Sequence, residues 1–394
     1  MFKLLVFIGI VAGVCQAELT KEEKDVSTGN NLLGFNIYKE LAKKPGNILF
    51  SPASAETILA LTYTGAKGKT AEEMKSTLNL PDPVSTAAGY KALTQRLEKS
   101  ENGVTYTSAN KIYPANDIKV HPAFLKVAQE SFSSDVENLD FSKGQESANT
   151  INKWVESKTN NKIKDLIKPD SLTSDTRMVL VNAVYFLGVW QHNFTLIPEK
   201  LKFHTSPTES VDTEFMFVEK HMGYAEDEDL DAQIIDIPYN DTDYSLRIIL
   251  PRQVDGLSKI ESQLPLDLEA QTKKLHDLNV NLKMPKFKIE TTIQLVDHLK
   301  ALGMKAAFGP GAELSGLSDE PLQISEVIQK AFIEVNEKGT EAAAATAGVG
   351  IPLSAGYLRR QKYVNMNKPF TFLLIKENSI LFLGHVKNPR KWRK

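Results

Sequence analysis

Residue types that carry enzyme chemistry occur in this sequence, but their spacing fits no common catalytic or metal site. No two histidines form the His-Glu-x-x-His pattern that holds zinc on one helix face. The histidines are His121, His192, His204, His221, His276, His298 and His385. Cys15 is the only cysteine, and the glycine pairs at 309–311 and 348–350 lack the third glycine of a dinucleotide-binding loop. We therefore expect no metal, no cofactor of this kind and no cysteine nucleophile. Carboxylates brought together only by folding remain an alternative.

Length and composition place the chain among ordinary globular proteins. It has 394 residues, and its 47 basic and 49 acidic residues give a formal charge of 47 − 49 = −2. Apolar residues make up 42% of the total. The near-neutral balance gives no reason to expect nucleic acid as a partner. No linker rich in proline, glycine or serine divides the chain, so we expect one large domain over residues 18–394.

Residues 1–17 have the pattern of a secretory signal peptide. A basic residue precedes an apolar run over 4–14, which is too short to span a bilayer and ends in a small-x-small cleavage sequence. A buried N-terminal strand is the alternative. Cleavage would remove Cys15 and leave a secreted chain without disulfides. In that compartment the sequons at Asn193 and Asn240 predict N-glycosylation.

Hydrophobic periodicity predicts mixed helices and strands, with helices concentrated in the first half of the chain. Amphipathic spacing or helix-start sequences predict helices over 30–44, from Ser51-Pro52, from Thr70 with Glu73 as a capping box, and over 145–159. Residues 178–190 are apolar on both faces, as expected of a strand in the middle of a sheet. Further strands are predicted over 244–250, 330–337 and 370–383. The predicted fold class is α+β.

The stretch after Glu337 differs from the rest of the chain because it is long and rich in small residues. An alanine-rich helix is one interpretation. The other is a loop that can become a strand inside a sheet, since alternate residues from Thr340 to Thr346 would form one face of small, uncharged side chains. No proline interrupts residues 337–351, so every backbone donor of such a strand is available.

The hinge sequence from Glu337 to Ala344 resembles that of inhibitory serpins, and the resemblance extends along the chain after residue 17. Other matching motifs follow in family order: 47–52 (NILFSP), 182–186 (NAVYF) with Trp190, 285–287 (PKF), Phe308 with 312–316 (AELSG), 367–370 (NKPF) and 382–386 (FLGHV). The chain is most similar to secreted arthropod haemolymph serpins. The resemblance implies the serpin fold, with three β-sheets, about nine helices and an exposed reactive-centre loop over about 337–364.

The same resemblance implies an irreversible suicide-substrate inhibitor of serine proteases without catalytic residues of its own. A protease attacks the loop and forms an acyl-enzyme, and the cleaved loop then inserts into the main sheet and traps the enzyme. The implied hinge residues are Glu337, Gly339, Thr340, Glu341, Ala342, Ala343, Ala344, Ala345 and Thr346. The implied shutter, a hydrogen-bonded cluster under the separating strands, is Ser51, Ser54, Asn182 and Gln329. The implied breach, at the top of the sheet, is Trp190, Lys286 and Glu337.

Family spacing places the scissile bond sixteen residues after the hinge glutamate, at Leu353–Ser354. Pro352 keeps the segment extended, and a leucine suits proteases with an apolar primary pocket, such as chymotrypsin or elastase. Arg359 and Arg360 are the competing site, because they lie in the same loop and trypsin-like proteases prefer basic residues.

The remaining expectations concern partners and location. A heparin-like glycosaminoglycan is a possible cofactor, and the basic residues that could bind it are Lys39, Lys43, Lys44, Lys91, Arg96 and Lys99. An ordinary solvated surface is the alternative. We expect a secreted monomer that restrains an extracellular protease cascade, such as one in innate immunity, and that binds neither nucleic acid nor membrane. A non-inhibitory serpin that serves as a carrier, chaperone or storage protein is the alternative function, and its hinge would be bulky or charged.

Overall fold

The structure is a computed structural model that describes residues 18–97, 102–340 and 361–390. In these residues the chain forms nine α-helices and three β-sheets, which confirms the predicted α+β class. The helices are α1 (Lys21–Ala42), α2 (Pro52–Thr64), α3 (Gly68–Leu78), α4 (Pro83–Leu97), α5 (Pro122–Phe132), α6 (Gly144–Lys158), α7 (Leu257–Ser262), α8 (Leu268–Lys274) and α9 (Val296–Ala301). Across this part of the chain, no helix is both long and apolar enough for a membrane span.

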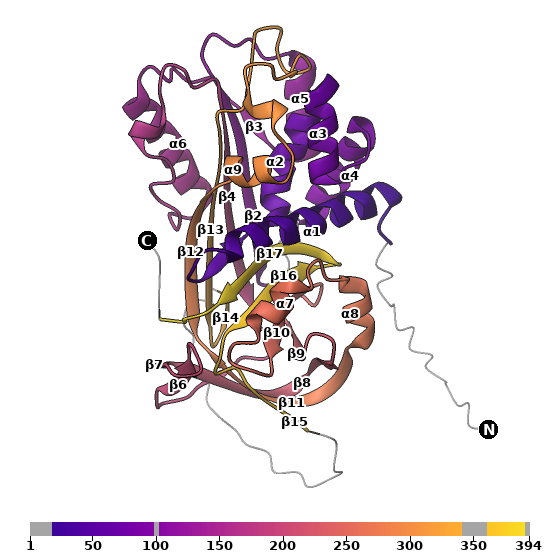
Figure 1. The fold of residues 1–394 in the computed structure, drawn as a ribbon, viewed down its shortest axis with the longest axis vertical. Coiled ribbons are helices and arrows are strands. Elements are labelled where there is room, and N and C mark those ends of the chain that lie inside the picture. Colours follow the sequence, from indigo (N-terminus) through magenta and orange to yellow (C-terminus); the bar gives the residue numbers. More distant parts are fainter. Residues whose placement is uncertain (1–17, 98–101, 341–360, 391–394) are drawn as a thin grey trace, which may run out of the picture.

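The six-stranded sheet, called the main sheet below, runs lengthwise through the molecule (Figure 1). Its strand order is β12 (Phe287–Gln294), β13 (Glu326–Asn336), β14 (Gly339–Thr340), β4 (Met178–Val189), β2 (Val104–Pro114) and β3 (Asp135–Val136). β13 pairs with both β14 and β4, because β14 is short and lies at one end of the sheet. The predicted central strand over 178–190 is therefore confirmed as β4.

A nine-stranded sheet fills the other end of the molecule, and a separate hairpin lies beside it (Figure 1). Its order is β1 (Ile48–Phe50), β17 (Ser379–Val386), β16 (Phe370–Lys376), β10 (Tyr244–Pro251), β9 (Ala232–Pro238), β8 (Phe215–Asp227), β11 (His276–Pro285) and β15 (Lys362–Asn365), with β5 (Thr195–Leu196) also on β8. The hairpin is β6 (Leu201–His204) with β7 (Ser210–Thr213). β15 is thus an edge strand, and it begins at Lys362, inside the range of about 337–364 predicted for the loop.

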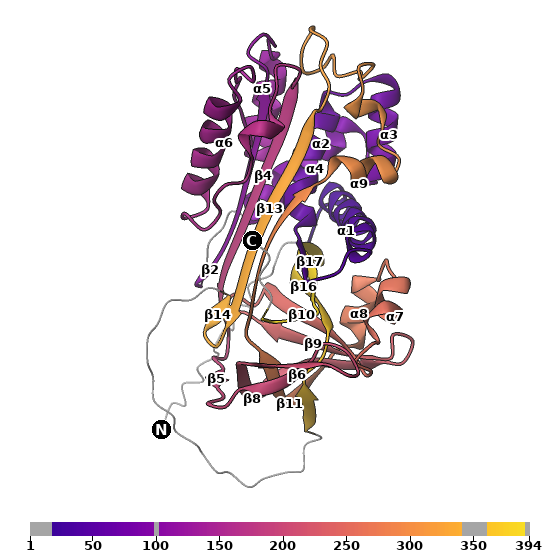
Figure 2. The ribbon, with the colours of Figure 1, turned by 60° about the vertical axis from the view of Figure 1, so that its left-hand side comes forward.

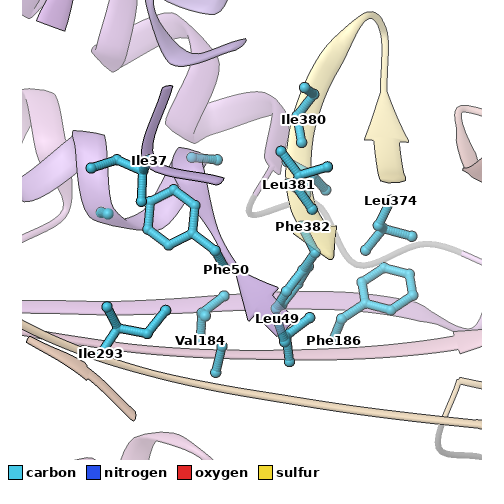
Figure 3. Packing of buried hydrophobic residues seen from close by; sticks show 14 of the residues in the cluster. Ile37, Leu49, Phe50, Val184, Phe186, Ile293, Leu374, Ile380, Leu381 and Phe382 are labelled. Atoms are coloured by element: carbon cyan, nitrogen blue, oxygen red, sulfur yellow. The ribbon is translucent and has the colours of Figure 1, made fainter. Parts of the chain in front are cut away.

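Helices cover both faces of the main sheet, with α6 on one side and α1, α2 and α4 on the other (Figure 2). This burial explains why β4 reads as apolar on both faces. Figure 3 shows the core between the sheets, where Leu49 of β1 lies near Val184 and Phe186 of β4 and near Phe382 of β17, while Phe50 lies near Ile37 of α1. One continuous core therefore holds α1, α2 and both large sheets together.

Two predictions from local sequence are wrong. The capping box at Thr70 and Glu73 does not start a helix, because α3 already begins at Gly68. Instead, Thr70 Oγ1 accepts the Glu313 N–H (2.9 Å), and Glu73 Oε2 accepts the N–H of Lys305 (2.7 Å) and of its neighbour. Both side chains serve a segment more than two hundred residues away, and local sequence cannot reveal such a partner.

The predicted single strand over 370–383 is in fact the hairpin β16–β17. Glu377 and Asn378 form its turn with φ of 46° and 68°, the left-handed region in which asparagine is relatively well tolerated.

The predicted first helix is present as α1 but begins earlier. Thr20 caps it, and Glu23 completes a capping box by accepting the Thr20 N–H at 2.7 Å.

Candidate functional site

The first hinge residues are already part of the main sheet. β14 pairs in antiparallel fashion with the end of β13 on one side and the end of β4 on the other. Gly339 has φ +155°, and a Cβ there would lie 1.9 Å from the Gly188 oxygen, so glycine is required. The Thr340 side chain is fully buried and shares a hydrogen bond of 2.7 Å with the Tyr239 hydroxyl. The predicted hinge residues 341–346 lie outside the described residues.

Beyond β14 the strands β13 and β4 pair directly with each other in parallel, from Glu326 opposite Val179 to Phe332 opposite Tyr185. We call this pairing the seam. A continuation of β14 would run along the seam, antiparallel to both strands, and would have to separate them. Parallel pairs are slightly less stable per residue than antiparallel pairs. Two antiparallel ladders in place of one parallel ladder would therefore stabilise the sheet.

The predicted breach residues surround the hinge. The Trp190 indole stacks on Tyr239 with ring centroids 4.5 Å apart, and its Nε1 donates to the Asn336 oxygen at 2.8 Å. The Trp190 backbone N–H donates to the Lys338 oxygen at 3.1 Å. These contacts hold the turn between β13 and β14, and through Tyr239 they reach the Thr340 side chain. Trp190 therefore supports the point at which the chain enters the main sheet.

Lys286 Nζ lies 3.0 Å from Glu337 Oε2 and 3.6 Å from Glu214, so the predicted ion pair is present. Burial alone would raise the pKa of Glu337, but hydrogen bonding to its own backbone and contact with Lys286 outweigh burial and lower it. The charged form of Glu337 is thus favoured at the first residue after β13.

The four predicted shutter residues lie together under the seam and are buried. Gln329 of β13 donates to Asn182 Oδ1 of β4 at 2.7 Å, and its Oε1 accepts the Ser51 N–H at 2.8 Å. The Asn182 amide donates to Ser54 Oγ of α2 and to Asn110 of β2. The network therefore joins β13 and β4, the two strands of the seam. Because an amide does not titrate, Gln329 keeps these bonds unchanged across neutral pH.

Sequence reasoning missed three residues of this site: Tyr239, Ser108 and Asn110. Ser108 Oγ lies 2.6 Å from Ser54 Oγ, and Asn110 Nδ2 donates to Ser108 at 3.0 Å. The available signal was a pair of polar residues two apart in an otherwise strand-like segment, which places them on one face. Asn182, the partner of Asn110, is 72 residues away, so the pattern alone could not identify the network.

A cluster of charged residues holds β15, the strand that follows residues 341–360, against β8. Lys362, the first residue of β15, places its Nζ 2.7 Å from Glu226 Oε1, and Arg252 contacts the other oxygen at 2.6 Å. These hydrogen bonds, that of Lys362 first, lower the pKa of Glu226 to about 2. Lys362 also lies over the Tyr224 ring at 5.1 Å. β15 is thus fixed to β8, and within the described part of the chain it pairs with a strand on one side only.

We expect Glu226→Gln to destabilise the protein at neutral pH and to have no effect near pH 2. The folded pKa of Glu226 lies below its unfolded value near 4.5, so the ion-pair contribution is complete above about pH 5 and disappears as pH falls toward 2. The check is the unfolding midpoint of both proteins from pH 7 to pH 2. Glu269→Gln, at an exposed pair with Lys273, is the matched control and should change little. A Glu226→Gln difference that persists at pH 2 would contradict the assignment.

The predicted polyanion residues are only partly available. Arg96 lies between two carboxylates, 2.6 Å from buried Glu23 and 3.6 Å from Glu377, and Lys43 contacts Glu40 at 2.7 Å. Lys44 and Lys91 are exposed, Lys39 is half-buried, and Lys99 lies outside the described residues. Arg96 therefore has a structural role between α1, α4 and the β16–β17 turn.

The remaining predicted positions are the two glycosylation sites and the residues of the two candidate scissile bonds. Asn193 and Asn240 are both exposed. Leu353, Ser354, Arg359 and Arg360 lie outside the described residues. Among residues 18–97, 102–340 and 361–390, no three histidine, aspartate or glutamate side chains converge as a metal site would require.

The architecture and the sequence match one family throughout. Residues 28–389 match the family model described as "Serpin (serine protease inhibitor)". The chain belongs to the serpin family. An antitrypsin of Bombyx mori is 36% identical over 97% of this chain and 99% of its own length, and antichymotrypsin-2 of the same species is 36% identical over 91% and 97%. The crystal structure of Serpin48, described as a highly specific serpin of Tenebrio molitor, has a TM-score of 0.85 and 36% identity over 94% of this chain and 99% of that one.

Membership confirms the family resemblance, which extends to insect serpins, and it confirms the three-sheet fold with nine helices in the described residues. The family consists of serine protease inhibitors, and serine proteases are the partners on which such proteins act. This serpin therefore has serine protease inhibition as its general function.

Proposed function

We propose that this protein is a secreted, irreversible inhibitor that traps a serine protease by inserting its cleaved loop along the seam. The observation that supports this most is the position of β14, whose two residues already occupy the entrance between β13 and β4. A strand that grows from Thr340 would extend along the seam and would replace the direct pairing of β13 with β4. Small residues from 342 to 346 would fit beneath the covering helices, whereas bulky or charged ones would not.

The chemistry of trapping comes from the protease. Its serine attacks the carbonyl of the loop residue, the peptide bond breaks, and the loop residue remains bound to that serine as an ester while the new amine leaves. Insertion then competes with hydrolysis of the ester. Each inserted residue gains backbone pairing on both sides, and the Asn182–Gln329 contact across the seam must open.

We propose Leu353–Ser354 as the trapping bond, with cleavage after Arg359 or Arg360 as the alternative. Relatives named antitrypsin and antichymotrypsin are equally similar to this chain, so their names do not choose between a basic and an apolar residue. The test is N-terminal sequencing of the small fragment released by the protease. A start at Ser354 supports Leu353, and a start at Arg360 or Gln361 excludes it.

The decisive test of inhibition is formation of an SDS-resistant complex with chymotrypsin, elastase or trypsin. We expect a covalent complex with at least one of them, together with a slower-migrating protease band. Cleavage of the loop without any complex would favour the alternative, a serpin that is a carrier, chaperone or storage protein. The small, uncharged hinge residues Gly339 and Thr340, which are already paired in the main sheet, favour the inhibitor.

Four accompanying proposals concern the setting in which the protein acts. The signal-peptide pattern at 1–17 and the exposed Asn193 and Asn240 support secretion and glycosylation, and detection of glycan-bearing protein in the culture medium would test both. A secreted monomer that inhibits serine proteases would restrain an extracellular protease cascade, such as one in innate immunity. Acceleration by heparin-like chains is tested by the rate of inhibition with and without heparin, and an unchanged rate would exclude it.

A further inference from the structure

Both ends of the segment 341–360 are attached at the same end of the molecule (Figure 1 and Figure 2). On the N-terminal side, the backbone N–H groups of Trp190 and Phe194 donate to the oxygens of Lys338 and Glu337, directly before β14. Residue 194 leads into β5, which pairs with β8. On the C-terminal side, β15 pairs with β11, and β11 with β8. The residues that flank the segment are therefore both connected to β8, on one side through β5 and on the other through β11.

The strands β8, β11 and β15 present one continuous outward surface. Side chains two apart in a strand share a face, and the register places Asn281 of β11 opposite both Glu219 of β8 and Tyr363 of β15. We call this surface the docking face and define it by six residues. They are Glu219, His221, Asn279, Asn281, Lys283 and Tyr363.

Tyr363 is the most prominent side chain of the docking face, because 70% of its surface is exposed. Exposed large hydrophobic side chains are few in the described residues. Besides Tyr363 they include Leu196 of β5, which pairs with β8 in the same nine-stranded sheet. Tyrosines with rigid rings and a polar tip are enriched in binding surfaces. The remaining two such residues, Val84 and Leu125, lie on α4 and α5 beside the main sheet.

Polar groups around Tyr363 are already oriented. Asn279 and Asn281 donate to the two oxygens of Glu219 at 3.4 and 3.3 Å, and His221 lies 3.1 Å from Asp277. Side chains ordered before binding lose less conformational entropy when a partner arrives. Acidic and basic groups are balanced over this surface, so contacts there would rest on the ring and on hydrogen bonds rather than on long-range attraction.

We propose that the docking face is a secondary binding surface for the serine protease that attacks the loop. This inference rests on the proposed function and adds a specificity-determining surface outside the scissile bond. A protease whose active site engages the loop would contact Tyr363 and the amides behind it. The contact would raise the rate of productive encounter and would leave the later insertion step unchanged.

The test compares wild type with Tyr363→Ala, Tyr363→Phe and Val84→Ala. Chymotrypsin, elastase and trypsin are each tried, and the association rate constant and stoichiometry are measured for those that give an SDS-resistant complex. We expect Tyr363→Ala to lower the rate about tenfold, as removal of a central aromatic contact does, without a change in stoichiometry. Tyr363→Phe should keep most of the rate because it keeps the ring. Val84→Ala should behave as wild type. The loss should be similar at about 0.05 M and about 0.5 M salt.

Three results would overturn the proposal. The first is a Tyr363→Ala rate within about twofold of wild type for every trapped protease. The second is a rate loss accompanied by higher stoichiometry or a lower melting temperature, which would indicate damage to β15. The third is a dimer of wild type that Tyr363→Ala abolishes while the rate stays unchanged, which would assign the face to a second copy. If wild type forms no SDS-resistant complex with any of the three proteases, the proposed function itself fails. The wild-type protein alone shows this, so that failure is distinct from failure of the docking face.

Discussion

Thr340→Arg is expected to convert the protein from an inhibitor into a substrate. Thr340 is fully buried between β13 and β4, and its hydroxyl bonds to buried Tyr239. An arginine there would place an unpaired charge among apolar groups at a cost of several kcal/mol, so β14 would leave the sheet and insertion could not begin. The protease would then hydrolyse the ester and depart. Titration of protease activity should show that at least about tenfold more variant than wild type is consumed per enzyme molecule inhibited. The reason is that each kcal/mol changes the ratio of loop insertion to ester hydrolysis severalfold.

Thr340→Ser is the control for this variant, since it keeps the hydroxyl and a small side chain. It should form the covalent complex with a stoichiometry close to that of wild type. Equal complex formation by Thr340→Arg would mean that the buried position of β14 has no part in trapping.

The second large effect is expected at Asn182, and it should depend on whether the loop has been cleaved. Asn182→Ala removes the group that bonds to Ser54, Asn110 and Gln329, and it leaves buried polar atoms without a partner. We expect a loss of about 2–4 kcal/mol in the free energy of unfolding of the intact protein. Insertion would place a strand between Asn182 and Gln329, roughly doubling their separation of about 4.8 Å, so that bond would already be absent after cleavage. The loss should therefore be smaller in the cleaved form.

Denaturant unfolding of intact and cleaved protein measures this difference. Asn47 provides the matched control, because its amide bonds to the backbone of Lys387 and Asn388, away from the seam. Asn47→Ala should destabilise both forms alike. An equal loss in both forms for Asn182→Ala would show that the seam does not open on cleavage.

Sequence alone predicted most reliably those features that depend on a single continuous segment of the chain. The apolar run of β4, the N-cap at Ser51 with Pro52 and the small residues after Gly339 all report local requirements, and the first two agree with the structure. The scissile bond depends on family spacing and stays a prediction. The ordered motifs identified the family, and the comparisons confirm it.

The rest depended on partners that are distant in the sequence. Arg96 looked like a free basic residue, but the fold places it against Glu23, 73 residues earlier. Tyr239 bonds to Thr340 from 101 residues away, and no pattern around it indicates that role. Tertiary contacts of this kind decide which polar residues serve the site and which serve the fold.

Thermal unfolding of intact and loop-cleaved protein tests the central proposal most directly. Insertion of about ten residues with two-sided pairing would contribute on the order of 10 kcal/mol. For a chain of this size the cleaved form should therefore melt at least about 10 °C above the intact form. Melting of the two forms within a few degrees of each other would mean that the severed segment does not enter the main sheet, and it would contradict the trapping mechanism.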